Sequence, residues 1–397
     1  MISRVFRFET RLIISASYFS FCTKFNDCTE KSDYASIGEA YPSISYIMVD
    51  NTDNLIRMYP QPLLKQFTDL DIKPNWIHYD INAQFNSDVN WYFVDNPNEI
   101  NQGQTDFLRN VIHEIIHGLG FVTSWSDSFY SDLAPLFPMN INKFITPFLL
   151  ASAENKGSLT NYQASQPFWG FVEFPFDKFI SYTTSSGELE SFTNITQQLN
   201  KFGNSNIMFK NTVDLANAWY NSDAYHQASQ IYIKANTSLD VMAVVDNELN
   251  IWLETAIPFL SGSSLCHVSE AIYLNTSDYL MVYFANKGVD LSQLDSLYPD
   301  GPIGPKLRTL MGALGYRMHN TSIKTIRPNL SYWSPAQDLV GTKSNPQPSL
   351  SVYTNGPARI PVANKTPISE HVSSSATRNP TYHHVSILIV FIALLLI

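Results

Sequence analysis

The segment from Val111 to Thr123, V-I-H-E-I-I-H-G-L-G-F-V-T, limits what this chain can be more than any other segment. Its histidines, His113 and His117, are four residues apart, so on a helix they lie on one face. Two histidines at this spacing with a glutamate between them, here Glu114, are typical of zinc metallopeptidases. Zinc lowers the pKa of a bound water toward about 7, and Glu114 can take the proton as the water attacks a peptide carbonyl.

The flanking residues favour a helix. Thr105 is a suitable N-cap, with Asp106 in the first turn. Apolar residues repeat in pairs at i, i+4 and i+8, which predicts a wide buried face: Phe107, Leu108, Val111, Ile112, Ile115 and Ile116. Gly118 and Gly120 supply the flexible backbone that ends the helix. The alternative is a structural helix with solvated histidines, because the bare pattern H-E-x-x-H also arises by chance.

A catalytic zinc takes three ligands from the protein, and this segment supplies two. In a large group of such sites the third ligand is a histidine where Thr123 stands, and a threonine offers only a weak neutral oxygen. The candidates elsewhere are Asp127, Glu154, His226, His267 and His319. His267 has the most context, because it follows a turn-like G-S-S and Met281 comes fourteen residues later. Asp127 and His226 remain open as alternatives.

These motifs together resemble the leishmanolysin-type metzincins, zinc endopeptidases that a glycolipid (GPI) anchor often tethers to the cell surface. Members of that family carry H-E-x-x-H followed by G-F, then a long insertion, a third histidine, a methionine turn and a final helix. The last helix ends in a glycine and an aromatic residue, as L-R-T-L-M-G-A-L-G-Y does here at 307–316. The resemblance spans roughly residues 8 to 320. It departs from the family in having only three cysteines and Val268 after the third histidine.

The resemblance assigns roles to individual residues. It implies one Zn²⁺ held by His113, His117 and His267, with Glu114 as general base and Met281 as the methionine beneath the metal. It also implies an α+β fold, that of a zincin-like (metzincin) two-lobed metalloprotease with a mixed sheet and an active-site helix. The implied N-terminal lobe covers 8–134, and the C-terminal lobe, which carries the third ligand and methionine turn, covers 135–320.

Hydrophobic patterns predict further elements. The predicted strands are Leu12–Tyr18, Ser43–Val49, Leu55–Tyr59, Tyr79–Phe85 and Asn90–Val94. Asn90–Val94, just before the active-site helix, is expected to bind an extended peptide by strand addition. The predicted helices are Pro62–Asp69, Phe192–Phe202, Val213–Trp219 and Lys306–Leu314, and 168–180 is predicted to be a strand followed by the start of a helix.

The two ends of the chain suggest a location. The last residues, 385–397, form an apolar run of thirteen, too short for a spanning helix of about 20 residues. Ser373–Ser375, a polar spacer and this run match the order of a GPI-anchor signal, so 376–397 is expected to be removed. Residues 321–375 read as a Ser/Pro/Thr-rich stalk. Residues 1–22 read as an atypical signal region or a first strand.

The composition of the chain limits the kinds of partner that it can bind. A net charge of −10 provides no basic patch for nucleic acid. Cys22 and Cys28 are close enough for a small disulfide loop, which leaves Cys266 over. The sequence therefore predicts a secreted or cell-surface zinc endopeptidase that acts on protein or peptide and meets the membrane only through a lipid anchor. The alternative is a non-catalytic surface binding or adhesion protein on the same scaffold.

Overall fold

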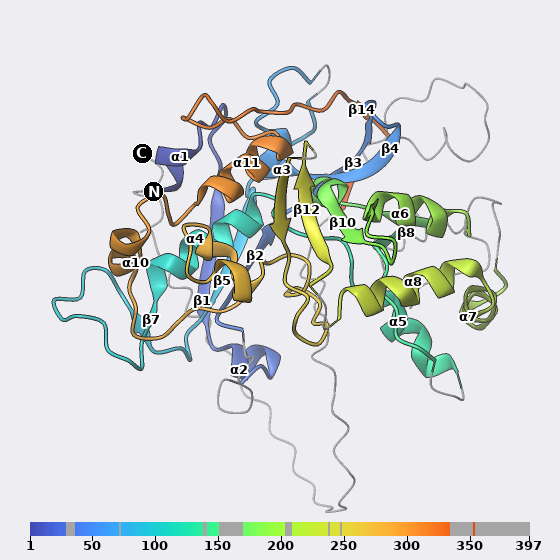
Figure 1. Ribbon diagram of the computed structural model, residues 1–397, viewed down its shortest axis with the longest axis horizontal. Coiled ribbons are helices and arrows are strands. Elements are labelled where there is room, and N and C mark those ends of the chain that lie inside the picture. Colours follow the sequence, from blue (N-terminus) through green and yellow to red (C-terminus); the bar gives the residue numbers. More distant parts are fainter. Residues whose placement is uncertain are drawn as a thin grey trace, which may run out of the picture.

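The protein is a mixed α+β structure built from several small sheets (Figure 1). The computed structural model describes residues 1–28, 36–70, 73–137, 141–150, 170–202, 209–236, 239–246, 248–333 and 352–353. The Glu154 candidate, the stalk from residue 334 to 351 and from 354 onward, and the anchor signal at 376–397 lie outside these residues. Within the described residues, no helix combines the length and apolar character needed to span a membrane.

A three-stranded sheet lies against the helix that carries the two histidines (Figure 1). Its spatial order is β1 (Ile14–Phe19), β5 (Ile81–Asn86) and β2 (Gly38–Pro42). β1 runs parallel to β5, β2 runs antiparallel to it, and β2 is the edge strand beside helix α4 (Phe107–Gly118). Alternate residues of β5 are buried in the main core, as expected for a strand with one covered face.

The second sheet joins distant parts of the chain. β3 (Ser45–Asp50) pairs with β4 (Leu55–Pro60) on one side. On its other side it pairs with β14 (Leu330–Tyr332) and β15 (Val352–Tyr353), both antiparallel. Residues 330–332 were assigned to the stalk from their composition, but here they form a strand. Trp333 is buried with residues of β3 and β4, so the folded body extends to at least residue 333.

The C-terminal half is built on an antiparallel four-stranded sheet with helices beside it (Figure 1). The strands, in spatial order, are β11 (Leu189–Ser191), β10 (Ile180–Thr183), β12 (Val241–Val245) and β13 (Leu249–Trp252). The helices are α6 (Phe192–Asn200), α7 (Thr212–Tyr220), α8 (Asp223–Lys234) and, last among the described residues, α11 (Pro305–Leu314). One hydrophobic core runs through both halves, and the Tyr316 hydroxyl, just after α11, donates to the Leu119 carbonyl at 2.7 Å.

Shorter elements complete the described structure. They are α1 (Ile2–Val5), α2 (Phe21–Phe25), α3 (Gln61–Leu64), β6 (Trp91–Tyr92), β7 (Thr105–Asp106), α5 (Ser128–Leu133), η1 (Ala134–Leu136), β8 (Phe148–Leu150), β9 (Gly170–Val172), η3 (Pro175–Phe179), α9 (Glu270–Tyr273), η4 (Tyr279–Met281) and α10 (Leu291–Leu297). Cys22 and Cys28 form the expected disulfide, and Cys266 is a buried free thiol.

Most predicted elements are confirmed with shifted bounds, but the expectation for Asn90–Val94 fails. The expected edge strand at Asn90–Val94 shrinks to β6, whose two residues are buried and pair parallel with β7. The strand at the edge of the sheet beside α4 is instead β2, which the sequence analysis missed. Its sequence, G-E-A-Y-P, contains a glycine and a proline, and both residues are depleted in strands.

Candidate metal centre

Helix α4 begins one residue later than expected. Asp106, and not Thr105, is its N-cap, because the Asp106 carboxylate accepts from the Arg109 N–H at 3.1 Å. Thr105 is extended and pairs with Trp91. The same carboxylate also accepts from the Leu291 N–H at the start of α10. Asp106 therefore both caps the helix and ties it to the C-terminal part of the chain.

The helix ends as the sequence predicts. Gly118 is its last residue, and Gly120 follows with φ of +113°. An L side chain rarely adopts that backbone conformation, so a glycine is needed where the chain turns away from the helix. The turn leads directly to Phe121, whose carbonyl becomes part of the site.

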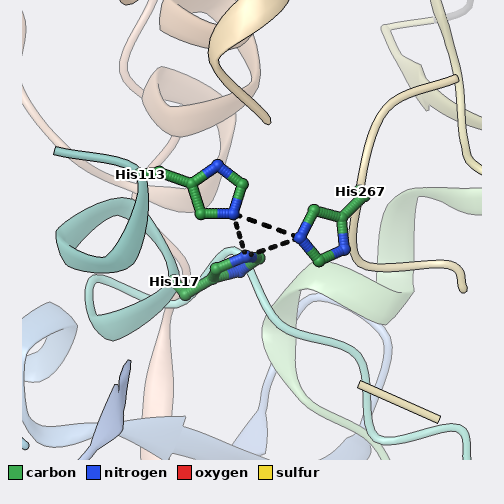
Figure 2. Close-up of side chains that lie close together, drawn as sticks. All are labelled: His113, His117 and His267. Carbon is green, nitrogen blue, oxygen red and sulfur yellow. Dashed lines mark hydrogen bonds between the residues drawn. The ribbon is translucent and has the colours of Figure 1, made fainter. Parts of the chain in front are cut away.

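The imidazole rings of three histidines lie close together, with one nitrogen of each ring facing the other two (Figure 2). His113 and His117 come from α4, and His267 comes from the segment after β13. Their Nε2 atoms are 3.1 Å apart for His113 and His267, 3.1 Å for His117 and His113, and 3.2 Å for His117 and His267. Nitrogens bound to a tetrahedral zinc at 2.0–2.1 Å would be about 3.3 Å apart, so the triangle has the size of a zinc site.

The other ring nitrogen of each histidine faces a backbone carbonyl. His113 Nδ1 lies 2.7 Å from the Leu280 oxygen, and His117 Nδ1 lies 2.7 Å from the Phe121 oxygen. His267 Nδ1 lies 2.8 Å from the Ser263 oxygen. A carbonyl can only accept, so each Nδ1 carries the proton and each Nε2 presents a lone pair. Carbonyl partners of this kind orient metal-binding histidines in zinc proteins.

This arrangement fits a cation. With every Nδ1 protonated, the three Nε2 atoms are all acceptors and cannot hydrogen-bond to one another. Three lone pairs held 3.1–3.2 Å apart repel each other unless a positive charge lies between them. Among the described residues, these histidines are the one group of three His, Cys, Asp or Glu side chains placed to hold a metal ion.

Burial keeps the imidazoles neutral, as metal binding requires. Desolvation lowers the pKa of His117 to about 4. Desolvation, followed by the charge of His117, lowers the pKa of His267 to about 3. The pKa of His113 is also lowered well below its usual value, first by desolvation and then by His117 and His267. His113 is the most exposed of the three.

Glu114 lies beside β2, an outer strand of its sheet. Its side chain is 4% exposed, and the Ala40 N–H of β2 donates to its carboxylate. Desolvation, followed by repulsion from Glu39, raises its pKa to about 8. A bound dication would favour the ionised form again, because it supplies the nearest opposite charge. A Cβ on Gly38 would stand 3.1 Å from the Glu114 carboxylate, so this glycine leaves room for the Glu114 side chain.

Met281 belongs to the segment that supports both His113 and His267. It is fully buried in η4 and follows Leu280, the residue whose carbonyl faces His113. Its own carbonyl accepts from the Val268 N–H at 2.8 Å, next to His267. Val268 also bridges to Leu253 and Val282. The predicted methionine turn is therefore packed against the two parts of the chain that bear the histidines.

The other candidates for a third ligand lie elsewhere. Asp127 accepts a hydrogen bond from the Ser261 hydroxyl at 2.7 Å. His226 is exposed on α8, and His319 is exposed with its Nε2 3.1 Å from the Ser3 carbonyl. The Thr123 hydroxyl donates to Asp177 at 2.6 Å. The structure therefore brings His267, and none of the other described candidates, to His113 and His117.

Some of the site could not be found from sequence. The carbonyls of Leu280, Phe121 and Ser263 belong to the backbone, which gives no side-chain signal. Asp177 is fully buried behind Thr123, yet it lies in a stretch that reads only as the start of a helix. Gly38 matters because β2 approaches α4 closely, and this approach depends on pairing with a strand more than forty residues away.

Comparison with known proteins identifies the family. A family model described as SPBPB7E8-like matches residues 1–353, so the chain belongs to the SPBPB7E8-like family. The uncharacterized protein PB7E8.01 of Schizosaccharomyces pombe (strain 972 / ATCC 24843) is 28% identical over 340 residues. This match covers 80% of the present chain and 57% of the relative, so the chain spans little more than half of that protein. No solved structure matches the chain.

Proposed function

We propose that this member of the SPBPB7E8-like family is a zinc-dependent endopeptidase of the metzincin type. The proposal rests on one observation, the triangle of Nε2 atoms from His113, His117 and His267 with Glu114 on the same helix. These nitrogens would hold Zn²⁺, which supplies a Lewis acid that polarises a carbonyl and acidifies water. Three protein ligands are the number that catalytic zinc sites use, since a fourth position stays open for the reaction.

Glu114 would be the residue that transfers protons in the reaction. Its carboxylate follows His113 in sequence, so it lies beside the ligands without being one of them. It accepts a proton from the attacking water and delivers it to the leaving amine, as a general base and then a general acid. The Ala40 N–H holds the carboxylate in place, and burial strengthens its interactions with the reacting groups.

Strand β2 is the best place for an extended peptide substrate. It is the outer strand of its sheet within the described residues, and it packs on α4 beside Glu114. A peptide can add to an edge strand as a further strand, and one N–H of β2, that of Ala40, is already bound to Glu114. Bound there, the peptide backbone would pass Glu114 with little dependence on its side chains. This position replaces the expected one at Asn90–Val94.

Cleavage of an unstructured protein by the purified full-length chain tests the proposal. The chain is incubated with reduced, alkylated casein in three conditions: no addition, 1,10-phenanthroline, and the non-chelating isomer 1,7-phenanthroline. We expect cleavage that the 1,10 isomer abolishes, that the 1,7 isomer leaves unchanged, and that added Zn²⁺ restores. The two isomers are matched in size and hydrophobicity, so a difference between them reports on the metal.

Two results would count against an endopeptidase. Cleavage that both isomers leave unchanged would contradict metal dependence. Stoichiometric zinc without cleavage of casein or of a peptide library would favour the alternative, a surface binding or adhesion protein on the same scaffold. Secretion and the GPI anchor remain predictions from sequence.

A further inference from the structure

The carbonyl that orients His117 belongs to a short segment outside α4. Phe121 follows the Gly120 turn, and its carbonyl oxygen lies 2.7 Å from His117 Nδ1. The last turn of α4 holds the Phe121 N–H, which donates to the Ile116 carbonyl at 3.3 Å, but residues 122–124 follow beyond this contact. If the segment 121–124 turned, the proton acceptor of His117 would move and the imidazole would be free to rotate. Contacts outside the helix hold the residues that follow, Thr123 and Ser124.

Asp177 makes the contacts that hold it. One carboxylate oxygen accepts from the Thr123 hydroxyl at 2.6 Å. The other accepts from the Ser124 N–H at 3.0 Å, from the Ser124 hydroxyl, and from the Phe174 N–H at 2.8 Å. Asp177 therefore ties residues 123 and 124 to η3, a helix that comes more than fifty residues later. In the same helix, Phe176 packs its ring 4.7 Å from that of Phe121.

Burying the Asp177 carboxylate is unfavourable unless its lone pairs all accept hydrogen bonds. Its side chain is fully buried, and among the described residues no basic side chain forms an ion pair with it. Placing a carboxylate in the interior costs several kcal/mol unless hydrogen bonds replace its water shell. Three of the four donors around it come from residues 123 and 124. The donors are therefore concentrated on the segment that leads back to His117.

We propose that Asp177 is a positioning residue of the candidate metal centre: by fixing Thr123 and Ser124 it holds the Phe121 carbonyl, and this carbonyl holds the His117 imidazole. The inference rests on the proposed metal site. It gives a role to Thr123, which stands where many zinc sites place their third histidine. In this chain that position holds a side chain that anchors the segment, while the third nitrogen comes from His267.

Metal affinity and the visible spectrum of bound Co²⁺ test the inference. Co²⁺ reports ligand geometry through its absorption bands, and a competing chromophoric chelator measures zinc affinity. Thr123→Val removes both hydrogen bonds of the hydroxyl, the one donated to Asp177 and the one accepted from the Trp125 N–H, at nearly constant volume. Thr123→Ser keeps the hydroxyl. Asp177→Asn replaces an acceptor by an amide whose NH₂ faces donors. Asp80→Asn is the control for loss of a buried carboxylate, because Asp80 is equally buried and accepts from Ile13, Gln61 and Lys65, none of which belongs to the segment 121–124.

We expect Asp177→Asn and Thr123→Val to lower zinc affinity by about tenfold, the lower end of the range for residues outside the ligand set. Both should change the Co²⁺ spectrum, while Thr123→Ser should match the wild type. Asp80→Asn should lower stability and leave affinity and spectrum unchanged. Unchanged affinity and spectrum in folded Thr123→Val and Asp177→Asn would overturn the inference, and Thr123→Val decides alone if Asp177→Asn fails to fold. A wild-type chain that binds no zinc would instead overturn the proposed function.

Discussion

The imidazoles of His113 and His267 are stacked within 24° of parallel, with their Nε2 atoms 3.1 Å apart, although 154 residues separate them in the chain. Nothing local to either residue brings them together. Their meeting depends on β2 and β5 beneath α4, and on the pairing of Val268 with Leu253 and Val282 beside His267. Such long-range convergence of three acceptors is the main support for a metal centre.

Replacing Glu114 by glutamine should separate metal binding from catalysis. Glutamine keeps the shape of the side chain but cannot accept the proton, so we expect full zinc content and a cleavage rate lower by about 10²–10⁴-fold. Metal analysis and casein cleavage on the same preparation measure both quantities. Wild-type turnover by this variant would show that another group is the base.

Replacing Gly38 by alanine should disturb Glu114 through sterics alone. A Cβ at this position would lie 2.5 Å from Asn110 Nδ2 and 3.1 Å from Glu114 Oε1, so one of them must move. We expect a loss of about 1–3 kcal/mol in the free energy of unfolding, as for other overpacked sites. We also expect lower kcat with unchanged zinc content.

Gly103→Ala is the matched control, because its nearest contact would be an ordinary 3.4 Å from Asn101. Unfolding in denaturant and steady-state kinetics are compared for both variants. Equal kinetics in Gly38→Ala and Gly103→Ala would refute the close approach of β2 to the base.

Glu173 should make stability depend on pH. It is 2% exposed, and desolvation, followed by repulsion from Asp177, raises its pKa from 4.5 to about 7. A carboxyl whose pKa is raised in the folded state stabilises most below its unfolded pKa and loses that contribution as pH rises through the folded value. Between pH 4.5 and 7, wild type should therefore lose roughly 3 kcal/mol relative to Glu173→Gln.

The measurement is the difference in unfolding free energy between wild type and Glu173→Gln from pH 4.5 to 8. Titration of the histidines and acid release of metal occur in both proteins and cancel in this difference. A difference that stays constant with pH, or that has the opposite sign, would contradict the raised pKa.

Removing the metal should lower the melting temperature. Zinc would join α4 to the segment that carries His267, so it binds the folded chain and not the unfolded one. At free zinc 100-fold above Kd this stabilises by about 2.7 kcal/mol. Thermal unfolding with and without a chelator should show the shift in wild type and in Glu114→Gln, but not in His113→Ala. An equal shift in His113→Ala would place the metal elsewhere.

The helix that carries His113 and His117 could be predicted because its signals are local. The spacing of His113 and His117, the apolar repeats and Gly120 all lie within one short segment, and the structure forms the helix there. The role of His267 could be predicted only from the order of the motifs around it, a following methionine and a last helix. A single histidine has no spacing pattern of its own. The predicted position of His267 near the other two matches the structure.

What could not be predicted depends on contacts between distant segments. Helix α8 is an exception, because it was not predicted although its N-cap is local: Ser222 accepts from the Tyr225 N–H. The edge strand β2 has weak strand propensity and is stabilised by pairing with β5. The N-cap was misplaced by one residue because Thr105 and Asp106 are both good caps, and only the pairing of Thr105 with Trp91 decides between them.

Bound zinc per protein molecule after exhaustive dialysis, measured for wild type, His267→Ala and His226→Ala, tests the central claim most directly. His226 is the control because it is an exposed histidine on α8, outside the group of three. We predict one zinc per chain in wild type and in His226→Ala, and almost none in His267→Ala. Full zinc retention in His267→Ala, or a wild-type chain that binds no zinc, would contradict the three-histidine centre.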